Sequence, residues 1–165
     1  MEAAMEYQVF LNFRTEDTHG FTKNLYDALD QAGILPFMDE YHEPLASWRA
    51  IERSLIAIIV FSKDYASSSR CLVELLQIMK YHRTQAQVVI PIFYNVDPFN
   101  VQHQIGRYGE VVGQYERIST MSHPEWLRRD LTEAANFDGY DNATFGNDDE
   151  LIARIVADVD HMLVD

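Results

Sequence analysis

The sequence has almost no cysteine, and its first residues lack an apolar segment. Cys71 is the one cysteine among 165 residues, so no disulfide can form within the chain. A disulfide framework is therefore excluded, and a reducing intracellular environment is expected. Residues 1–6 carry two acidic side chains and no apolar run, so no signal peptide is expected. Charges interrupt every apolar run well before the roughly 18 residues that a membrane span needs, so none is expected.

Basic residues are scarce as well. The chain has 13 Lys and Arg against 26 Asp and Glu, a net charge of −13. This charge repels phosphate backbones and anionic membranes, so neither nucleic acid nor a membrane is an expected partner. A small anionic ligand is not excluded, because helix N-termini and a single arginine can create a local positive potential.

Several motifs of well-known sites are absent. The sequence contains no GxGxxG, Walker A or GxSxG motif, so it lacks the usual glycine-rich phosphate loops and the nucleophile elbow. Six histidines are present, but their spacing with Cys71 does not match a set of metal ligands. We therefore expect no metal site.

What the sequence does contain is typical of one globular α/β domain. Apolar residues make up 47% of the chain and aromatic residues 12%, which is enough for a substantial core. Residues 56–61 and 88–94 are apolar on both alternating faces, as in strands of a parallel sheet that is covered on both sides. Pro36 places the strand at 34–38 at a sheet edge. Strands are predicted at 7–13, 34–38, 56–61, 88–94 and 139–140, and helices at 21–32, 48–55, 68–81, 109–118, 125–136 and from 148 onward.

Ligands of open parallel sheets bind outside the carboxyl ends of the strands, which directs attention to the segments that follow them. These segments are residues 14–19, 39–47, 62–70 and 95–105. By residue type alone, Asp97 is most simply a turn residue beside a proline. In the same way, Arg14, Glu16 and Asp17 read as a solvated charged loop.

Glu74 falls on the predicted helix at 68–81, near this edge of the sheet. It lies about 200° around the helix from Leu72, which belongs to the apolar stripe. Periodicity alone therefore predicts a solvent-facing glutamate that pairs with Arg70, four residues earlier.

Four segments resemble signatures of plant-type TIR (Toll/interleukin-1 receptor) domains. Residues 7–18 are similar to the first signature of that family, and residues 131–136 to its late helix. Residues 60–68 together with 71–75 resemble its third strand and following helix, and residues 89–98 resemble its second box. The match covers nearly all of residues 6–163, in order and with suitable spacing.

The resemblance implies a flavodoxin-like three-layer sandwich with a five-stranded parallel sheet, with residues 1–6 as an N-terminal tail and 7–165 as the TIR domain. It also implies an NAD+ hydrolase that releases nicotinamide and ADP-ribose-type products in plant immune and cell-death signalling. The resemblance further implies that self-association activates the hydrolase, and that the partners are other copies of the chain or other TIR domains. The expected location is the cytoplasm or the nucleus, with a nucleotide-binding and leucine-rich-repeat region in cis as a further expected partner.

Site residues follow from the same resemblance. Glu74 matches the catalytic glutamate, and Phe13 and Arg14 match a Phe-Arg pair that lines the same pocket. Asp39 and Ser62 fall on the pocket edges. NAD+ is expected as the substrate, with no cofactor and no metal.

The sequence also departs from the family pattern. Thr15 replaces a common glycine, and Arg70 replaces the tryptophan that usually precedes the cysteine. The segment 39–47 looks shortened and has no glycine. Lys23 and Asn24 replace a Ser-His pair at a helix-mediated dimer contact.

Gly106, in contrast, keeps the glycine of a second self-association surface. Two functions thus remain open: an NAD+ hydrolase, and a catalytically weak or inactive interaction module that acts through TIR–TIR contacts. A flavodoxin or response-regulator relative is disfavoured, because the phosphoacceptor cluster and an FMN phosphate loop are both missing.

Overall fold

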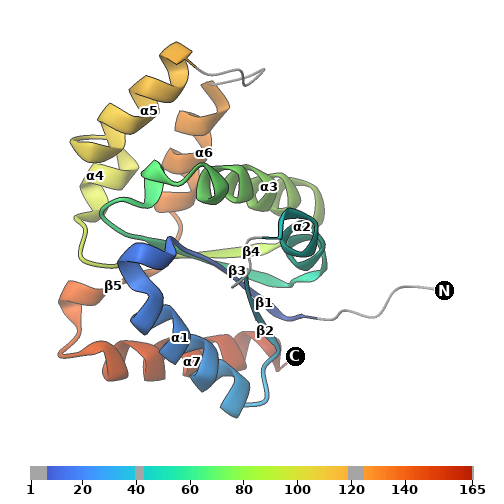
Figure 1. The fold of residues 1–165 in the computed structure, drawn as a ribbon. Coiled ribbons are helices and arrows are strands. Elements are labelled where there is room, and N and C mark those ends of the chain that lie inside the picture. The colour runs from blue at the N-terminus through green and yellow to red at the C-terminus, as the bar shows by residue number, and fades with distance from the viewer. Residues whose placement is uncertain (1–6, 40–42, 119–124, 165) are drawn as a thin grey trace.

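In the computed structural model, which describes residues 7–39, 43–118 and 125–164, five parallel strands form one sheet in the order β2-β1-β3-β4-β5 (Figure 1). The predicted tail at residues 1–6 lies outside the described residues. The strands are β1 Val9–Asn12, β2 Pro36–Met38, β3 Ile56–Phe61, β4 Val88–Phe93 and β5 Tyr140–Asp141. β2 is an edge strand, as Pro36 predicts.

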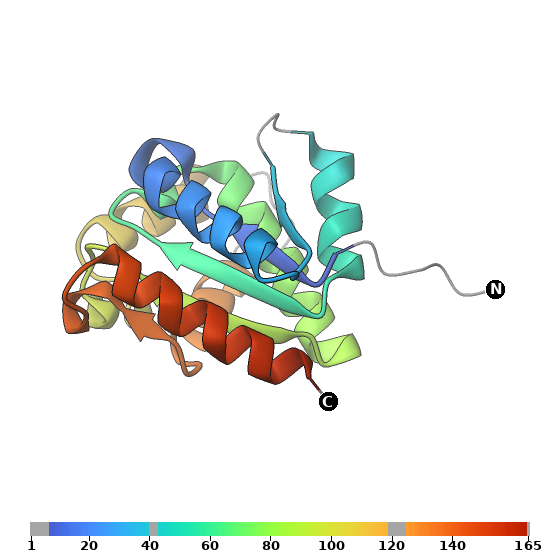
Figure 2. The same ribbon diagram turned by 90° about the horizontal axis from the view of Figure 1, so that it is seen from below.

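Helices cover both faces of this sheet, which gives a three-layer, flavodoxin-like α/β fold as predicted (Figures 1 and 2). α1 and α7 lie side by side on one face, and α2 to α6 pack on the other. The helices are α1 Thr15–Gln31, α2 Pro44–Arg53, α3 Ser69–Gln85, α4 Pro98–Gln102, α5 Arg107–Ile118, α6 Glu125–Ala135 and α7 Asp148–Leu163. Short 3-10 turns occupy Tyr65–Ser67 and Asn142–Thr144.

β3 shows how the sequence produces the three layers. All six of its residues are buried, and successive side chains point to opposite faces. Ala57, Ile59 and Phe61 join the core under α2 to α6, whereas the alternate residues join the core under α1 and α7. A strand that is apolar on both faces therefore requires helices on both sides.

Several element boundaries differ from the prediction. α1 begins at Thr15 rather than Phe21, so residues 15–19, which we expected to be a loop, are helical apart from a kink at Thr18. Glu16 and Asp17 suit the positive end of the helix dipole, which explains the early start. α2 begins at Pro44 rather than at residue 48, because proline fits the first turn of a helix, where its missing N–H costs nothing.

Gly139 is required because the chain passes very close to β4 at this position. A Cβ built on Gly139 would lie 2.0 Å from the carbonyl oxygen of Pro91, so no other residue fits there. This contact lets the chain enter β5, where Tyr140 pairs with Ile92.

Because all strands are parallel, their carboxyl ends meet at one edge of the sheet. Asn12, Met38, Phe61 and Phe93 end β1 to β4 there. None of the helices in the described parts of the chain is long and apolar enough to cross a membrane.

Candidate functional site

Glu74 is buried, with only 2% of its surface exposed, so the prediction of a solvent-facing side chain is wrong. The apolar stripe of α3 indicates only the side that packs on the sheet. α2 packs beside α3 as well, and it covers a second side of the helix. The carboxylate thus lies near the end of β1, where Asn12 Nδ2 donates a 2.9 Å hydrogen bond to Glu74 Oε1.

Arg70 pairs with Glu74, as their spacing predicts. Arg70 Nη1 lies 3.2 Å from Oε1 and 3.1 Å from Oε2 of the carboxylate. Arg70 Nη2 donates a 2.7 Å hydrogen bond to the backbone oxygen of Phe13, just beyond β1. The guanidinium therefore ties the first turns of α3 to the carboxyl end of β1.

Burial and pairing act on Glu74 in opposite directions. Burial raises the pKa of Glu74, while Arg70 and the Asn12 hydrogen bond lower it, and the net pKa lies above the ordinary value. Burial alone would lower the pKa of Arg70, but the Glu74 carboxylate raises it above its usual value. Arg70 therefore stays protonated beside Glu74.

Asn12 is a site residue that no sequence motif predicted. Its Oδ1 accepts a hydrogen bond from the Tyr65 hydroxyl, which orients the amide so that Nδ2 faces Glu74. The same Nδ2 lies 3.4 Å from the backbone oxygen of Cys71. The sequence feature that could have identified Asn12 is its position, since it is a polar residue at the carboxyl end of an apolar strand.

Phe13 contributes its backbone rather than its ring. Its carbonyl oxygen accepts from Arg70 Nη2 and, at 3.2 Å, from Cys71 Sγ. The Phe13 side chain packs into the core under α1 and α7, on the other face of the sheet from α3. Burial raises the pKa of the Cys71 thiol to about 12, so the thiol is neutral and acts here as a hydrogen-bond donor.

Arg14 and Ser62 meet at Asp17, a residue expected to lie in a solvated loop. Asp17 accepts from Arg14 Nη1 at 2.6 Å, from Ser62 Oγ at 2.7 Å and from the Asp64 backbone N–H at 2.9 Å. Burial alone would raise the pKa of Asp17, but these hydrogen bonds together outweigh it and hold the pKa below its ordinary value. Arg14 also pairs with Glu16 at 3.4 Å.

Asp39 forms a third group at the same edge. This buried carboxylate accepts from Ser47 Oγ at 2.7 Å and from the Glu43 backbone N–H at 3.3 Å, so it fixes the start of α2. It is close enough to Glu74 and Arg70 to raise the pKa of both. Residues 40–42 of the shortened segment lie outside the described residues.

A cleft of about 240 Å³ lies between α2 and α3, and Glu74 and Arg70 line it. Its remaining lining residues are Pro44, Trp48, Ser69 and Val73. Trp48 on α2 supplies an aromatic surface to the cleft. At position 70 on α3, arginine stands in place of the tryptophan expected from the family resemblance. Pockets for whole drug-sized ligands measure about 300–1,000 Å³, so this cleft suits one end of a dinucleotide.

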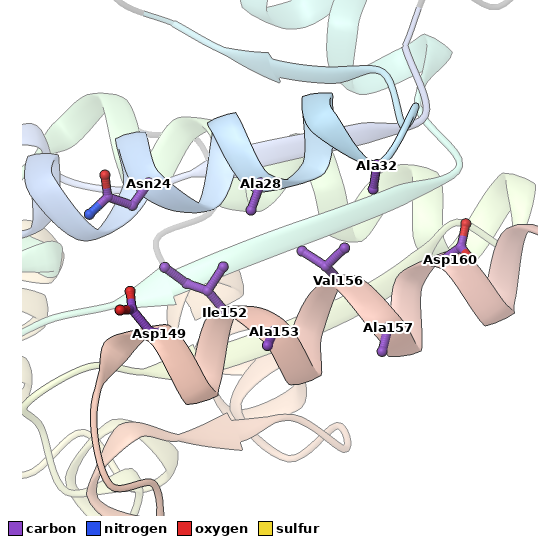
Figure 3. Close-up of a pocket in the computed structure, with 9 residues that line it drawn as sticks. All are labelled: Asn24, Ala28, Ala32, Asp149, Ile152, Ala153, Val156, Ala157 and Asp160. Carbon is purple, nitrogen blue, oxygen red and sulfur yellow. The ribbon is translucent and has the colours of Figure 1, made fainter.

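A larger groove of about 520 Å³ lies between α1 and α7, on the opposite face of the sheet (Figure 3). In Figure 3, Ala28 and Ala32 of α1 point toward Ile152 and Val156 of α7. Asn24, at the expected helix-mediated contact, lines one end of the groove. The groove is therefore separate from the Glu74 cleft.

Elsewhere in the described segments, no group of three or more His, Cys, Asp or Glu side chains is arranged to hold a metal ion.

Comparison with protein families gives one match over nearly the whole chain. The model described as TIR domain matches residues 6–165. Disease resistance protein RPV1 of Vitis rotundifolia is 45% identical over 140 residues, which cover 81% of this chain and 10% of that protein. Disease resistance protein RPS6 of Arabidopsis thaliana is 38% identical over 159 residues, which cover 93% of this chain and 14% of that protein. The chain thus spans only a small part of these relatives.

Solved structures of TIR domains also resemble this chain. The TIR domains in the structure of the activated Roq1 resistosome directly recognizing the pathogen effector XopQ superpose with a TM-score of 0.82 at 36% identity, covering 92% of this chain and 98% of that one. The RPS4 and RRS1 TIR domain heterodimer gives a TM-score of 0.60 at 18% identity, covering 93% and 96% of the two chains. The second likeness supports the fold alone.

Proposed function

From the premise that this chain belongs to the TIR domain family, we propose that it is an NAD+ hydrolase in plant immune signalling, activated by self-association. One observation carries the proposal: the buried, hydrogen-bonded Glu74 carboxylate lines a cleft at the carboxyl edge of a parallel sheet. The relatives named above are disease resistance proteins, which supports the immune role.

The chemistry suits a carboxylate in this place. When the bond between ribose C1′ and the nicotinamide nitrogen breaks, its electron pair leaves with nicotinamide and neutralises the pyridinium. Positive charge then develops on the ribose, and the Glu74 carboxylate stabilises it, as carboxylates do in glycoside hydrolysis. Water attacks C1′ and loses a proton, which gives ADP-ribose.

We assign the other predicted residues the following roles around the same edge. Arg14, with 24% of its side chain exposed, balances the pyrophosphate charge, and Phe13 supports Arg70 through its backbone. Asp39 holds the start of α2 in place through Ser47. Ser62 holds the start of α1 in place through Asp17.

The test is nicotinamide release, followed by HPLC, for wild type, Glu74→Ala and Glu74→Gln. We expect both substitutions to abolish release. Because an unpaired, partly buried arginine is destabilising, the double variant Arg70→Gln with Glu74→Gln is included, and thermal unfolding checks the fold of each variant. Asp130→Asn is the matched control, since Asp130 is another buried carboxylate paired with arginines, on α6. Equal release by wild type and Glu74→Gln contradicts the proposal.

A second candidate function, a non-catalytic interaction module, is favoured by the groove between α1 and α7. It is larger than the Glu74 cleft and is lined mainly by small and apolar side chains. Titration of protein concentration at fixed NAD+ separates the two functions. Release per molecule that rises steeply with concentration supports the hydrolase, whereas no release at any concentration favours the module.

A further inference from the structure

Arg70 has an unusual place for a cation in an acidic chain. It binds both oxygens of Glu74 through Nη1 and the carbonyl of Phe13 through Nη2, so its head group is fixed at two points. In the described part of the chain, no other cationic side chain donates a hydrogen bond to Glu74.

The remaining groups around Glu74 provide little compensation for its charge. Asn12 donates one neutral hydrogen bond from β1, and Asp39, after β2, adds a like charge. The pKa of Cys71 is raised to about 12 and that of Tyr65 is raised by burial, so both are neutral near pH 7. Arg70 is therefore the main group that keeps a carboxylate ionised in this buried position.

The hydrogen bonds also distinguish the two oxygens of Glu74. A carboxylate has about four acceptor positions, two on each oxygen. Oε1 accepts from both Asn12 and Arg70, whereas Oε2 accepts from Arg70 alone among the described groups. One acceptor position on Oε2 is left for a ligand in the cleft.

We propose that Arg70 is a positioning residue for the hydrolysis proposed above: it is the fixed counter-charge of Glu74 and leaves Oε2 to act on the ribose. This inference rests on the proposed function for its catalytic meaning. The ionisation of Glu74, however, can be measured without any turnover.

The first experiment is a 13C NMR titration of the Glu74 carboxyl group, identified by loss of its signal in Glu74→Gln. In Arg70→Gln we expect the pKa of Glu74 to rise by about 1–3 units, the range for a neighbouring opposite charge. Arg70→Lys keeps the charge, and we expect it to give a smaller rise in the pKa of Glu74. This variant also tests the proposal if Arg70→Gln fails to fold.

Arg83→Gln is the matched control. Arg83 lies on the same helix and makes comparable bonds, at 2.6 Å to Asp130 and 2.9 Å to Glu133. We expect the pKa of Glu74 to stay unchanged in this variant. An unchanged pKa in Arg70→Gln, or an equal rise in Arg83→Gln, overturns the proposal whether or not the chain hydrolyses NAD+.

The second experiment is the pH profile of nicotinamide release. Ionised Glu74 is the active form, so release rises with pH through the pKa of Glu74. Loss of Arg70 raises that pKa, and the acidic limb of the profile therefore moves to higher pH by the same amount, with partial rescue in Arg70→Lys. Faster release by Arg70→Gln at every pH contradicts the proposal, because Arg70 then blocks Glu74. If wild type releases no nicotinamide, the proposed function fails and the NMR titration alone decides the role of Arg70.

Discussion

Asp17 joins three parts of the chain at the carboxyl edge of the sheet. Its carboxylate holds Arg14 at the start of α1, and it holds Ser62 and Asp64 in the segment after β3. Arg107 on α5 in turn bonds Asp64 at 3.0 Å, which extends the network to the next helix. One side chain thus fixes Arg14 and Ser62, two of the residues that the family resemblance predicts for the site.

We predict that Asp17→Asn lowers the free energy of unfolding at pH 7 by about 2 kcal/mol, the scale of a hydrogen bond to a charged group. The pKa of Asp17 is lowered in the folded chain. Its contribution is therefore present above the unfolded value of about 3.9 and is lost as pH falls through the folded value. The gap between wild type and variant should close at low pH, as measured by urea unfolding from pH 7 to 2.5.

Asp27→Asn is the control for this prediction. Asp27 also lies on α1, but it forms an exposed pair with Lys23 at 2.8 Å. Such pairs contribute about 0–1 kcal/mol, so a small effect is expected. A gap for Asp17→Asn that stays constant with pH would mean that its charge is not what stabilises the fold.

At the scale of elements, α2 and α3 together form the cleft. α3 supplies the charged residues Arg70 and Glu74, and α2 supplies the indole of Trp48. Within the described segments, no other ring or cation stacks on Trp48. In the proposed reaction, the cleft therefore offers an open aromatic face to the nicotinamide ring.

We predict that Trp48→Ala raises KM for NAD+ about fivefold to thirtyfold and changes kcat less. A pyridinium cation over an indole gains about 1–2 kcal/mol, and this gain is present before the bond breaks. Trp126→Ala on α6 is the control, because Trp48 and Trp126 are exposed to nearly the same extent, 42% and 43%. Steady-state kinetics of both variants and of Trp48→Phe provide the measurement. Equal KM values for the two alanine variants contradict a role of Trp48 in binding.

The layers of the fold were predictable because β3 and β4 are apolar on both faces, and such strands need helices on both sides. The start of α1 was missed, since residues 15–20 have no apolar periodicity and only the acidic first turn favours a helix. Pairing of Arg70 with Glu74 followed from their spacing, but the burial of Glu74 did not. That burial depends on α2, whose position no pattern within α3 reveals.

The Asp17 network could not be predicted for a similar reason. Its hydrogen bonds join positions 45 and 47 residues apart, and only the sheet topology brings them together. The family resemblance supplied Glu74, Phe13, Arg14, Asp39 and Ser62 as site residues. The roles of Asn12 and of the Phe13 carbonyl could not be predicted, because they depend on how the end of β1 lies against α3 in the folded chain.

For the whole molecule, charge opposes the proposed self-association. Each copy carries a net charge of −13. Exposed charges act over a Debye length of about 8 Å at physiological salt, and added salt shortens that range. Acidic residues also stand at the rim of the α1–α7 groove, as Asp149 and Asp160.

We predict that self-association is weak at low salt and strengthens as NaCl rises from 50 to 500 mM, as measured by sedimentation equilibrium. Ala157→Arg, which places a long charged side chain in the groove, should weaken it at every salt concentration. Thr84→Arg is the control: it adds the same charge on α3, away from the groove, and should leave self-association unchanged. A dimer that tightens when salt is diluted would instead indicate attraction between patches of opposite sign.

The two-point attachment of Arg70 has a consequence for how related chains can diverge. An isoform that kept this arginine but replaced Glu74 with an apolar residue would leave a partly buried cation held by the Phe13 carbonyl and a weak contact with Cys71 Sγ. Such a chain would be destabilised by up to about 3–5 kcal/mol, a large share of the roughly 5–15 kcal/mol by which a typical domain is stable. Among related chains, loss of Glu74 should therefore be accompanied by replacement of Arg70.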